Sequence, residues 1–95
     1  STMNVVDNAV EITEDGVYLI SYFADGAVAT GDYEVSLYLN GAPVTNEVLA
    51  FSGTTGLGSK TVLLSLSAGD SVALYNTSAE TATLSGASLT LLKLA

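Results

Sequence analysis

Hydrophobic and polar residues alternate with the period of β-strands along much of the chain. In residues 33–39, one set of alternate positions is apolar, whereas the other contains Glu34 and Ser36. Residues 71–76 repeat this alternation. It is typical of strands with one buried and one solvent-exposed face. Because no segment combines helix caps with apolar residues at helical spacing, the pattern predicts an all-β protein.

Turn residues separate the apolar segments at intervals of about 8–12 residues, which is typical of β-sandwiches and barrels. The strongest hairpin signal is Asn40-Gly41. The predicted strands are residues 3–6, 9–13, 17–24, 33–39, 44–51, 60–66, 71–76 and 83–94. Residues 25–32 are predicted as a loop, apart from an optional extension of the preceding strand at 27–29, and residues 52–59 as a mobile loop.

The longest apolar run, residues 17–24, is apolar on both faces. Its two faces carry Leu19 and Phe23 on one side and Tyr18, Ile20 and Tyr22 on the other. A two-sheet sandwich covers only one face of each sheet, so the second face needs another cover. A loop of the same chain is one candidate and a second copy of the chain is the other. The loops are short and rich in Ser and Thr, which favours a second copy.

Composition excludes several classes of function. The 95 residues suffice for one domain, and ten acidic residues against two lysines give a net charge of −8. This charge disfavours binding to nucleic acids and to anionic membranes. Histidine and cysteine are absent, which removes Ser-His-Asp and Cys-His catalysis, His/Cys zinc sites and disulfides. No apolar run reaches the length of a membrane span and no signal peptide is evident.

Carboxylates are the remaining candidate site residues. Asp25 and Asp32 bracket the predicted loop 25–32 and offer the oxygen ligands that calcium prefers. The alternative, which we favour, is that they are solvated turn residues. We therefore expect no catalytic residue, no cofactor and no bound metal, with calcium at Asp25 and Asp32 as the competing interpretation.

Three further features have a structural and a functional interpretation. Tyr38 and Tyr75 fall on predicted exposed faces, where they could stack on a sugar. Asn76-Thr77-Ser78 matches the N-glycosylation sequon, which has no meaning in most bacterial contexts. Asp70 is expected to form a hydrogen bond within its turn and to have no catalytic role.

Four short motifs occur in a fixed order along the chain. They are Gly16-Val17-Tyr18, Asn40-Gly41, Gly69-Asp70-Ser71-Val72 and Ser85-Gly86. Their order and spacing resemble the TNF-like jelly-roll superfamily, which includes the globular heads of complement's collagen-tailed recognition subunit. The resemblance covers roughly residues 7–95. It implies a homotrimeric sandwich of two antiparallel sheets, an inner one with strands 17–24, 60–66 and 83–94 and an outer one with strands 33–39, 44–51 and 71–76.

The Ala/Ser/Thr-rich texture is most similar to the C-terminal heads of BclA-type collagen-like exosporium glycoproteins of spore-forming bacteria. This resemblance implies a single head domain over residues 1–95, on the bacterial cell or spore surface, with structural and adhesive roles. It implies a trimer interface of Leu19, Ser21, Phe23, Leu92 and Leu94, with the chain itself and a host or surface glycan or protein as partners. The competing interpretation is the receptor- or carbohydrate-binding tip of a phage tail fibre. Either an upstream strand and a collagen-like stalk precede residue 1, or the chain forms a smaller sandwich.

Overall fold

A computed structural model describes residues 4–5 and 9–95 of the chain, and their regular structure consists of strands. The strands are β1 (Asn4–Val5), β2 (Val10–Glu11), β3 (Gly16–Val28), β4 (Glu34–Leu39), β5 (Ala42–Ala50), β6 (Thr55–Leu66), β7 (Ser71–Asn76) and β8 (Ala82–Lys93). Within the described ranges, no helix has the length and apolar character needed to cross a bilayer. The prediction of an all-β protein is confirmed.

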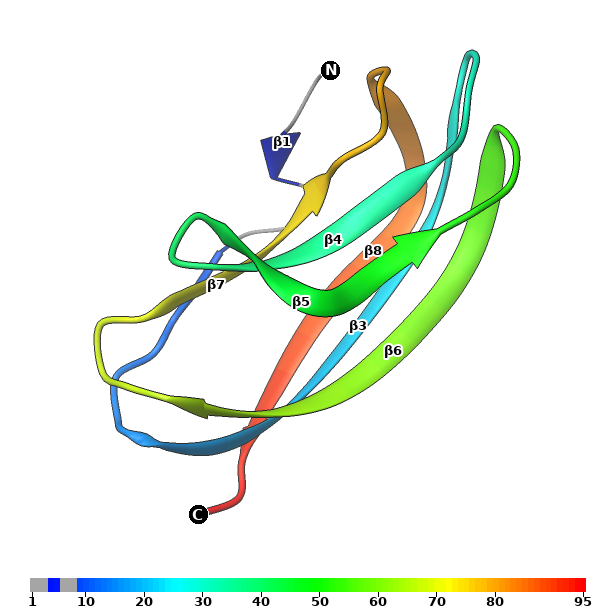
Figure 1. The fold of residues 1–95 in the computed structure, drawn as a ribbon. Helices are drawn as coiled ribbons and strands as arrows, with labels where there is room; N and C mark the ends of the chain where they lie inside the picture. Colours follow the sequence, from blue (N-terminus) through cyan, green and yellow to red (C-terminus); the bar gives the residue numbers. More distant parts are fainter. Residues whose placement is uncertain (1–3, 6–8) are drawn as a thin grey trace.

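The strands form two antiparallel sheets that face each other (Figure 1). The five-stranded sheet has the order β1–β7–β4–β5, with β2 also paired to β7. The three-stranded sheet has the order β6–β3–β8, and in Figure 1 its long strands β3 and β8 pass behind β4 and β5. The predicted division of the strands between two sheets is therefore confirmed.

The core lies between the sheets and is built from alternate residues of each strand. Along β3, the side chains of Tyr18, Ile20, Tyr22 and Ala24 are at most 8% exposed. They meet Tyr33, which directly precedes β4, and inward residues of the five-stranded sheet, which include Val35, Leu37, Val72 and Leu74. Since full burial of one large aliphatic side chain stabilises a fold by about 1.5–3 kcal/mol, this alternating set fixes which face of β3 points inward. The expected core face of β3 is confirmed.

The predicted loop at residues 25–32 is wrong over its first half, because β3 continues through Asp25 and Gly26 to Val28, which agrees with the strand extension allowed at 27–29. Gly26 is an inward-facing strand residue and not a turn residue. A Cβ atom at Gly26 would lie 2.8 Å from the Tyr33 hydroxyl oxygen and 2.9 Å from the Thr83 carbonyl oxygen. Glycine is therefore present to allow close packing inside the sandwich, and the turn begins only after β3.

The predicted mobile loop at residues 52–59 is also wrong over most of its length, because β6 begins at Thr55. The ring of Phe51 lies directly against Gly56 and next to Gly58, in space that a Cβ atom at Gly56 would occupy. Phe51 also stacks on Tyr33, with ring centroids 5.5 Å apart. The two glycines provide a flat backbone surface for an aromatic ring, which is compatible with a regular strand.

The Asn40-Gly41 hairpin between β4 and β5 is confirmed. Asn40 and Gly41 have φ angles of 53° and 81°, as a type I′ turn requires. The strand that follows, β5, is an edge strand, and this explains why it tolerates Pro43. Asn46, with φ of 66°, lies in the irregular part of β5, where its register with β4 shifts.

Candidate functional site

The most distinctive surface is the side of the β6–β3–β8 sheet that points away from the five-stranded sheet, here called the outward face. Residues directly opposite one another in antiparallel strands share a face, so the register defines its rows. Three consecutive rows are Leu63–Leu19–Leu92, Thr61–Ser21–Thr90 and Ser59–Phe23–Ser88. Apolar and hydroxyl side chains therefore lie side by side across all three strands.

The outward face carries large apolar side chains that the single chain leaves in water. Leu57, Leu63 and Leu92 are 65%, 56% and 57% exposed, and Leu94, 54% exposed, follows at the C-terminal end of the face. The backbone amide of Leu94 donates a hydrogen bond to the Val17 carbonyl oxygen at 2.7 Å, so it remains attached to β3. Single exposed leucines are ordinary, but several on one sheet face indicate an interaction surface.

The residues implied as a trimer interface lie on this face. Leu19, Ser21 and Phe23 are three of the outward residues of β3 and are half-buried, and Leu92 lies opposite Leu19. Leu94 is at the end of the same face. Sequence reasoning missed Leu63 and Leu57. The alternation of residues 60–66 contains the signal for Leu63, whereas Leu57 lay in the segment predicted as a loop.

Charge is nearly absent from the outward face. Asp25 is the one acidic residue in β3, β6 and β8, and it lies opposite Leu57 on this face. Lys60 is opposite the inward-facing Tyr22, and its ammonium group donates a hydrogen bond to the Asn46 carbonyl oxygen at 2.8 Å. The face therefore combines apolar and hydroxyl groups with one negative charge.

A partly buried polar contact lies on the inward side of the same sheet. The Tyr22 hydroxyl donates a hydrogen bond of 2.7 Å to the Glu47 carboxylate, which connects β3 to β5 across the sandwich. Burial, together with this hydrogen bond and the nearby negative charge of Glu47, raises the pKa of Tyr22 well above its usual range. The contact therefore links the two sheets through one side-chain hydrogen bond.

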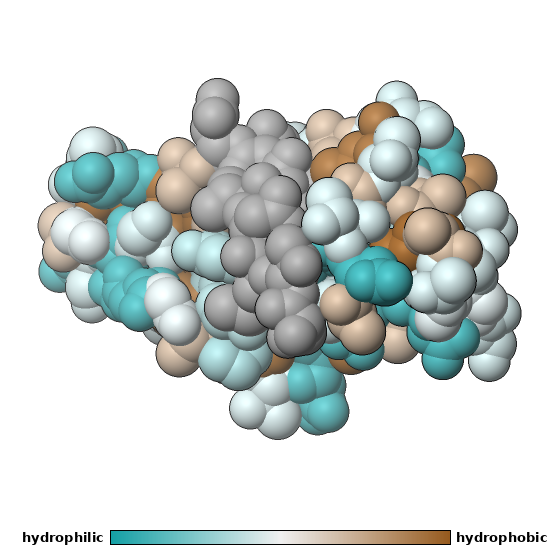
Figure 2. Space-filling model, turned by 90° about the horizontal axis from the view of Figure 1, so that it is seen from above, coloured by the Kyte–Doolittle hydropathy of each residue, from teal (hydrophilic) through white to brown (hydrophobic). Residues whose placement is uncertain are grey.

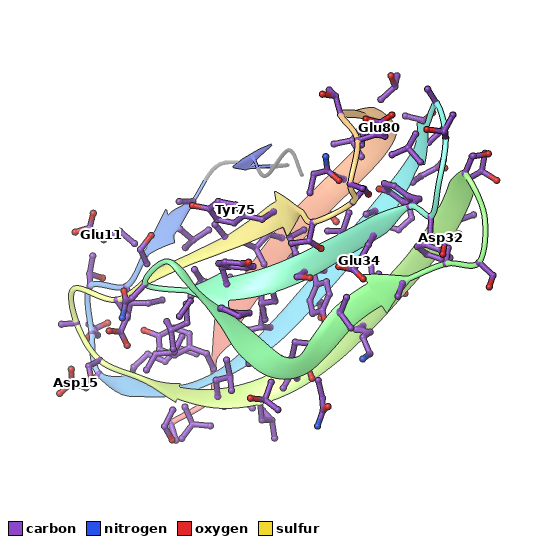
Figure 3. The ribbon with its side chains drawn as sticks, turned by 45° about the horizontal axis from the view of Figure 1, so that its top comes forward. Glu11, Asp15, Asp32, Glu34, Tyr75 and Glu80 are labelled. Carbon is purple, nitrogen blue, oxygen red and sulfur yellow. The ribbon has the colours of Figure 1, made fainter. Side chains whose placement is uncertain are left out.

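The calcium candidates Asp25 and Asp32 do not flank one loop. Asp25 lies within β3, whereas the Asp32 carboxylate accepts a hydrogen bond from the Gly53 amide at 2.9 Å in the turn after β3. The acidic residues labelled in Figure 3 are dispersed, with Glu11 and Asp15 at one end of the sandwich and Asp32 and Glu80 at the other. Among the described residues, no group of three or more acidic side chains is placed to hold a metal ion.

Most of the carboxylates have a local structural partner instead. Asp15 accepts a hydrogen bond from the Ala68 amide, Glu34 from the Thr77 hydroxyl and Glu80 from the Thr30 hydroxyl. Asp70 accepts one from the Ser67 amide, which confirms the expected turn hydrogen bond. Seen from above, hydrophilic and hydrophobic residues interleave (Figure 2), and no pocket is found in the part of the chain that is described.

The tyrosine and sequon candidates also have structural roles. Tyr38 and Tyr75 form a tilted pair with ring centroids 4.5 Å apart, but Tyr38 is only 8% exposed, so the two do not make an open stacking platform. Asn76 is 1% exposed. Its side-chain amide donates a hydrogen bond to the Glu80 carbonyl oxygen and accepts one from the Ser78 amide. This buried side chain shapes the β7–β8 turn and is closed to glycosylation in the folded protein.

Comparisons with known proteins give one family. The family model of the BclA C-terminal domain matches residues 1–95. A search of curated proteins finds no match. Among solved structures, the chain is similar to CBM35 from Paenibacillus barcinonensis, with a TM-score of 0.44 and 20% sequence identity. That match covers 87% of this chain and 66% of the other, so the chain spans slightly less than two thirds of that structure.

Proposed function

The chain belongs to the BclA C-terminal domain family, and we propose that it is the non-enzymatic, trimerising head of a collagen-like glycoprotein on the bacterial cell or spore surface. The observation that carries the proposal is the outward face of the β6–β3–β8 sheet. Four leucines on or at the end of this face, Leu57, Leu63, Leu92 and Leu94, are more than half exposed in the single chain. Packing against two further copies would remove them from water, and a second copy is the usual cover for such a sheet face.

The strand order supports a TNF-like jelly roll as the form of this head. The chain passes repeatedly between the sheets, so that β3, β6 and β8 lie in one sheet and β4, β5 and β7 in the other. The same division of strands was expected from the resemblance to the TNF-like superfamily. In such an assembly the inner sheet, here the three-stranded sheet, faces the neighbouring copies.

A trimeric head has a physical role at the end of a collagen-like stalk. Three separate chains must align before a triple helix can form, and this alignment is entropically costly. A head that already holds three chains together converts this step into an intramolecular one at high effective concentration. The head would thereby set the number and the register of the chains in the stalk.

The experiment joins a Gly-Pro-Pro repeat to the N-terminus of the chain and measures triple-helix formation by circular dichroism after heating and cooling. The fusion with the natural head should refold with concentration-independent kinetics while its trimer is intact. A Leu19→Asp head, which places a charge in the Leu63–Leu19–Leu92 row, should make refolding slower and concentration-dependent. Thr45→Asp on the exposed part of β5 is the matched control and should behave like the natural head. Equal refolding of all three fusions would contradict the proposed nucleating role.

A further inference from the structure

Two turns at one end of the sandwich are joined through the side chain of Asn40. The Asn40 side-chain amide donates a hydrogen bond to Asp70 Oδ1 at 2.9 Å, and its side-chain oxygen accepts one from the Ser71 amide at 2.8 Å. The Asn40 backbone amide also donates to the Ser71 carbonyl oxygen at 2.8 Å. The β4–β5 turn is therefore fixed to the β6–β7 turn by three hydrogen bonds from a single residue.

Asp70 is itself held in place for this contact. Its second carboxylate oxygen, Oδ2, accepts a hydrogen bond from the Ser67 amide at 2.8 Å. This backbone hydrogen bond, and then the one from Asn40, lower the pKa of Asp70. Asp70 is therefore charged near neutral pH and presents a fixed acceptor to the Asn40 side-chain amide.

Asn40 also has the sequence context in which an asparagine is chemically least durable. It is the one asparagine of the chain that is followed by glycine. Because glycine has no side chain, its backbone nitrogen approaches the preceding side-chain amide without steric hindrance. Attack of the Gly41 nitrogen on Asn40 Cγ forms a C–N bond and a five-membered imide. The Cγ–Nδ2 bond breaks, and the nitrogen leaves as ammonia with the proton lost from the Gly41 amide. Addition of one water molecule then opens the imide to aspartate or isoaspartate.

We propose that Asn40 is a deamidation site that its contacts with Asp70 and Ser71 keep unreacted in the folded protein. Attack requires Cγ to rotate toward the Gly41 nitrogen, and this rotation must break the hydrogen bonds at both ends of the Asn40 side chain. The φ angles of 53° and 81° at Asn40 and Gly41 belong to a hydrogen-bonded hairpin turn, which also resists closure to the imide. The reaction is therefore coupled to opening of this end of the sandwich.

The product would not restore the contact. An aspartate at position 40 lacks the donor that Asn40 offers to Asp70 and places a second carboxylate beside the first, and like charges in contact repel. Isoaspartate additionally inserts a methylene group into the backbone of the two-residue turn, which disturbs the pairing of β4 with β5. Each reacted chain would thus lose the link between the two turns irreversibly, which makes Asn40 a chemical record of local opening.

The test follows deamidation at Asn40 by peptide mass spectrometry and an isoaspartate assay in mildly alkaline buffer. The folded chain should react at least about tenfold more slowly than the same chain in concentrated urea, a factor that corresponds to ~1.4 kcal/mol. Asp70→Ala should accelerate the reaction of the folded protein several-fold. Asp70→Asn keeps an oxygen acceptor for the Asn40 amide, so its reaction rate should lie between those of the folded natural chain and the Asp70→Ala protein. Glu11→Ala, at another exposed carboxylate, should match the natural chain.

Two results would overturn the inference. One is equal reaction rates in the folded and the urea-unfolded natural chain. The other is an Asp70→Ala protein with a native circular dichroism spectrum and an unchanged rate. If Asp70→Ala does not fold, the comparison of the Asp70→Asn protein with the folded and unfolded natural chain decides the question in the same way.

Discussion

Truncation of Leu92 on the outward face should weaken assembly without weakening the fold of the single chain. Leu92 is 57% exposed in the single chain and lies opposite Leu19. Burial of a whole leucine side chain stabilises by about 2 kcal/mol, so burial of the exposed part in an interface contributes about 1 kcal/mol per copy. Leu92→Ala should therefore cost a trimer ~3 kcal/mol over its three copies.

This cost predicts a measurable shift in the concentration at which the trimer dissociates. A loss of ~3 kcal/mol raises the dissociation constant by roughly 100-fold. Because that constant for three identical chains has the dimension of concentration squared, the midpoint concentration should rise by about its square root, or roughly tenfold. Sedimentation or light scattering over a dilution series measures this midpoint concentration. At a concentration where the natural chain and Leu92→Ala are both monomeric, thermal unfolding should give nearly the same midpoint temperature for the two proteins.

The control for Leu92→Ala is Val48→Ala. Val48 is a half-buried aliphatic residue of β5, in the other sheet. Its truncation should leave the association midpoint unchanged. The reasoning fails if Leu92→Ala does not move the midpoint, or if Val48→Ala moves it equally.

Four further substitutions in β3 test its two faces, its outward charge and its buried tyrosine. Ile20→Asp should abolish folding, at a cost above ~4 kcal/mol, because Ile20 is 0% exposed and the core offers the new carboxylate no partner. Phe23→Asp should instead yield a folded monomer. Circular dichroism and light scattering distinguish these results, and the opposite pattern would show that the two faces of β3 are assigned the wrong way round. Asp25→Asn removes the charge from the outward face and should lower the midpoint concentration of trimer dissociation severalfold. Glu11→Gln makes the same change in net charge on β2 and should have less effect. Equal shifts in the two variants would show that only net charge matters. The pKa of Tyr22 is raised in the folded state above its ordinary value of 10.0, so the unfolded chain loses this proton first and stability should fall as the pH rises past 10.0. Tyr22→Phe should make this fall less steep in urea titrations at a series of pH values. An unchanged dependence of stability on pH would contradict the assignment.

The sheets were predictable from the sequence because side-chain alternation records which face of a strand is buried. The apolar faces of residues 17–24 predicted both the core side and the outward side of β3, and the core side is confirmed by burial. The ends of β3 and β6 were not predictable, because Gly26, Gly56 and Gly58 appeared to be turn residues. In the structure these glycines make room for Tyr33 and Phe51, which fold back onto them across a turn. A single sequence does not reveal such a contact.

The residues of the candidate site were predictable where the alternation of side chains along one strand places them on the same face. Leu19, Ser21 and Phe23 share a face by alternation alone, but their neighbours in space depend on the register with β6 and β8. Alternation places Leu63 on one face of β6, and its position opposite Leu19 shows that this face belongs to the surface. The hydrogen bonds that join Asn40 to Asp70 were not predictable either, because they connect two turns that the sequence separates by 30 positions.

The most direct test of the central claim is the mass of the natural chain in solution, measured by sedimentation equilibrium at micromolar concentration. The outward face of the β6–β3–β8 sheet predicts a single species of three times 9.6 kDa, which dissociates on dilution without loss of β structure. A chain that remains a monomer of 9.6 kDa throughout the concentration range, with its leucines exposed, would contradict the account.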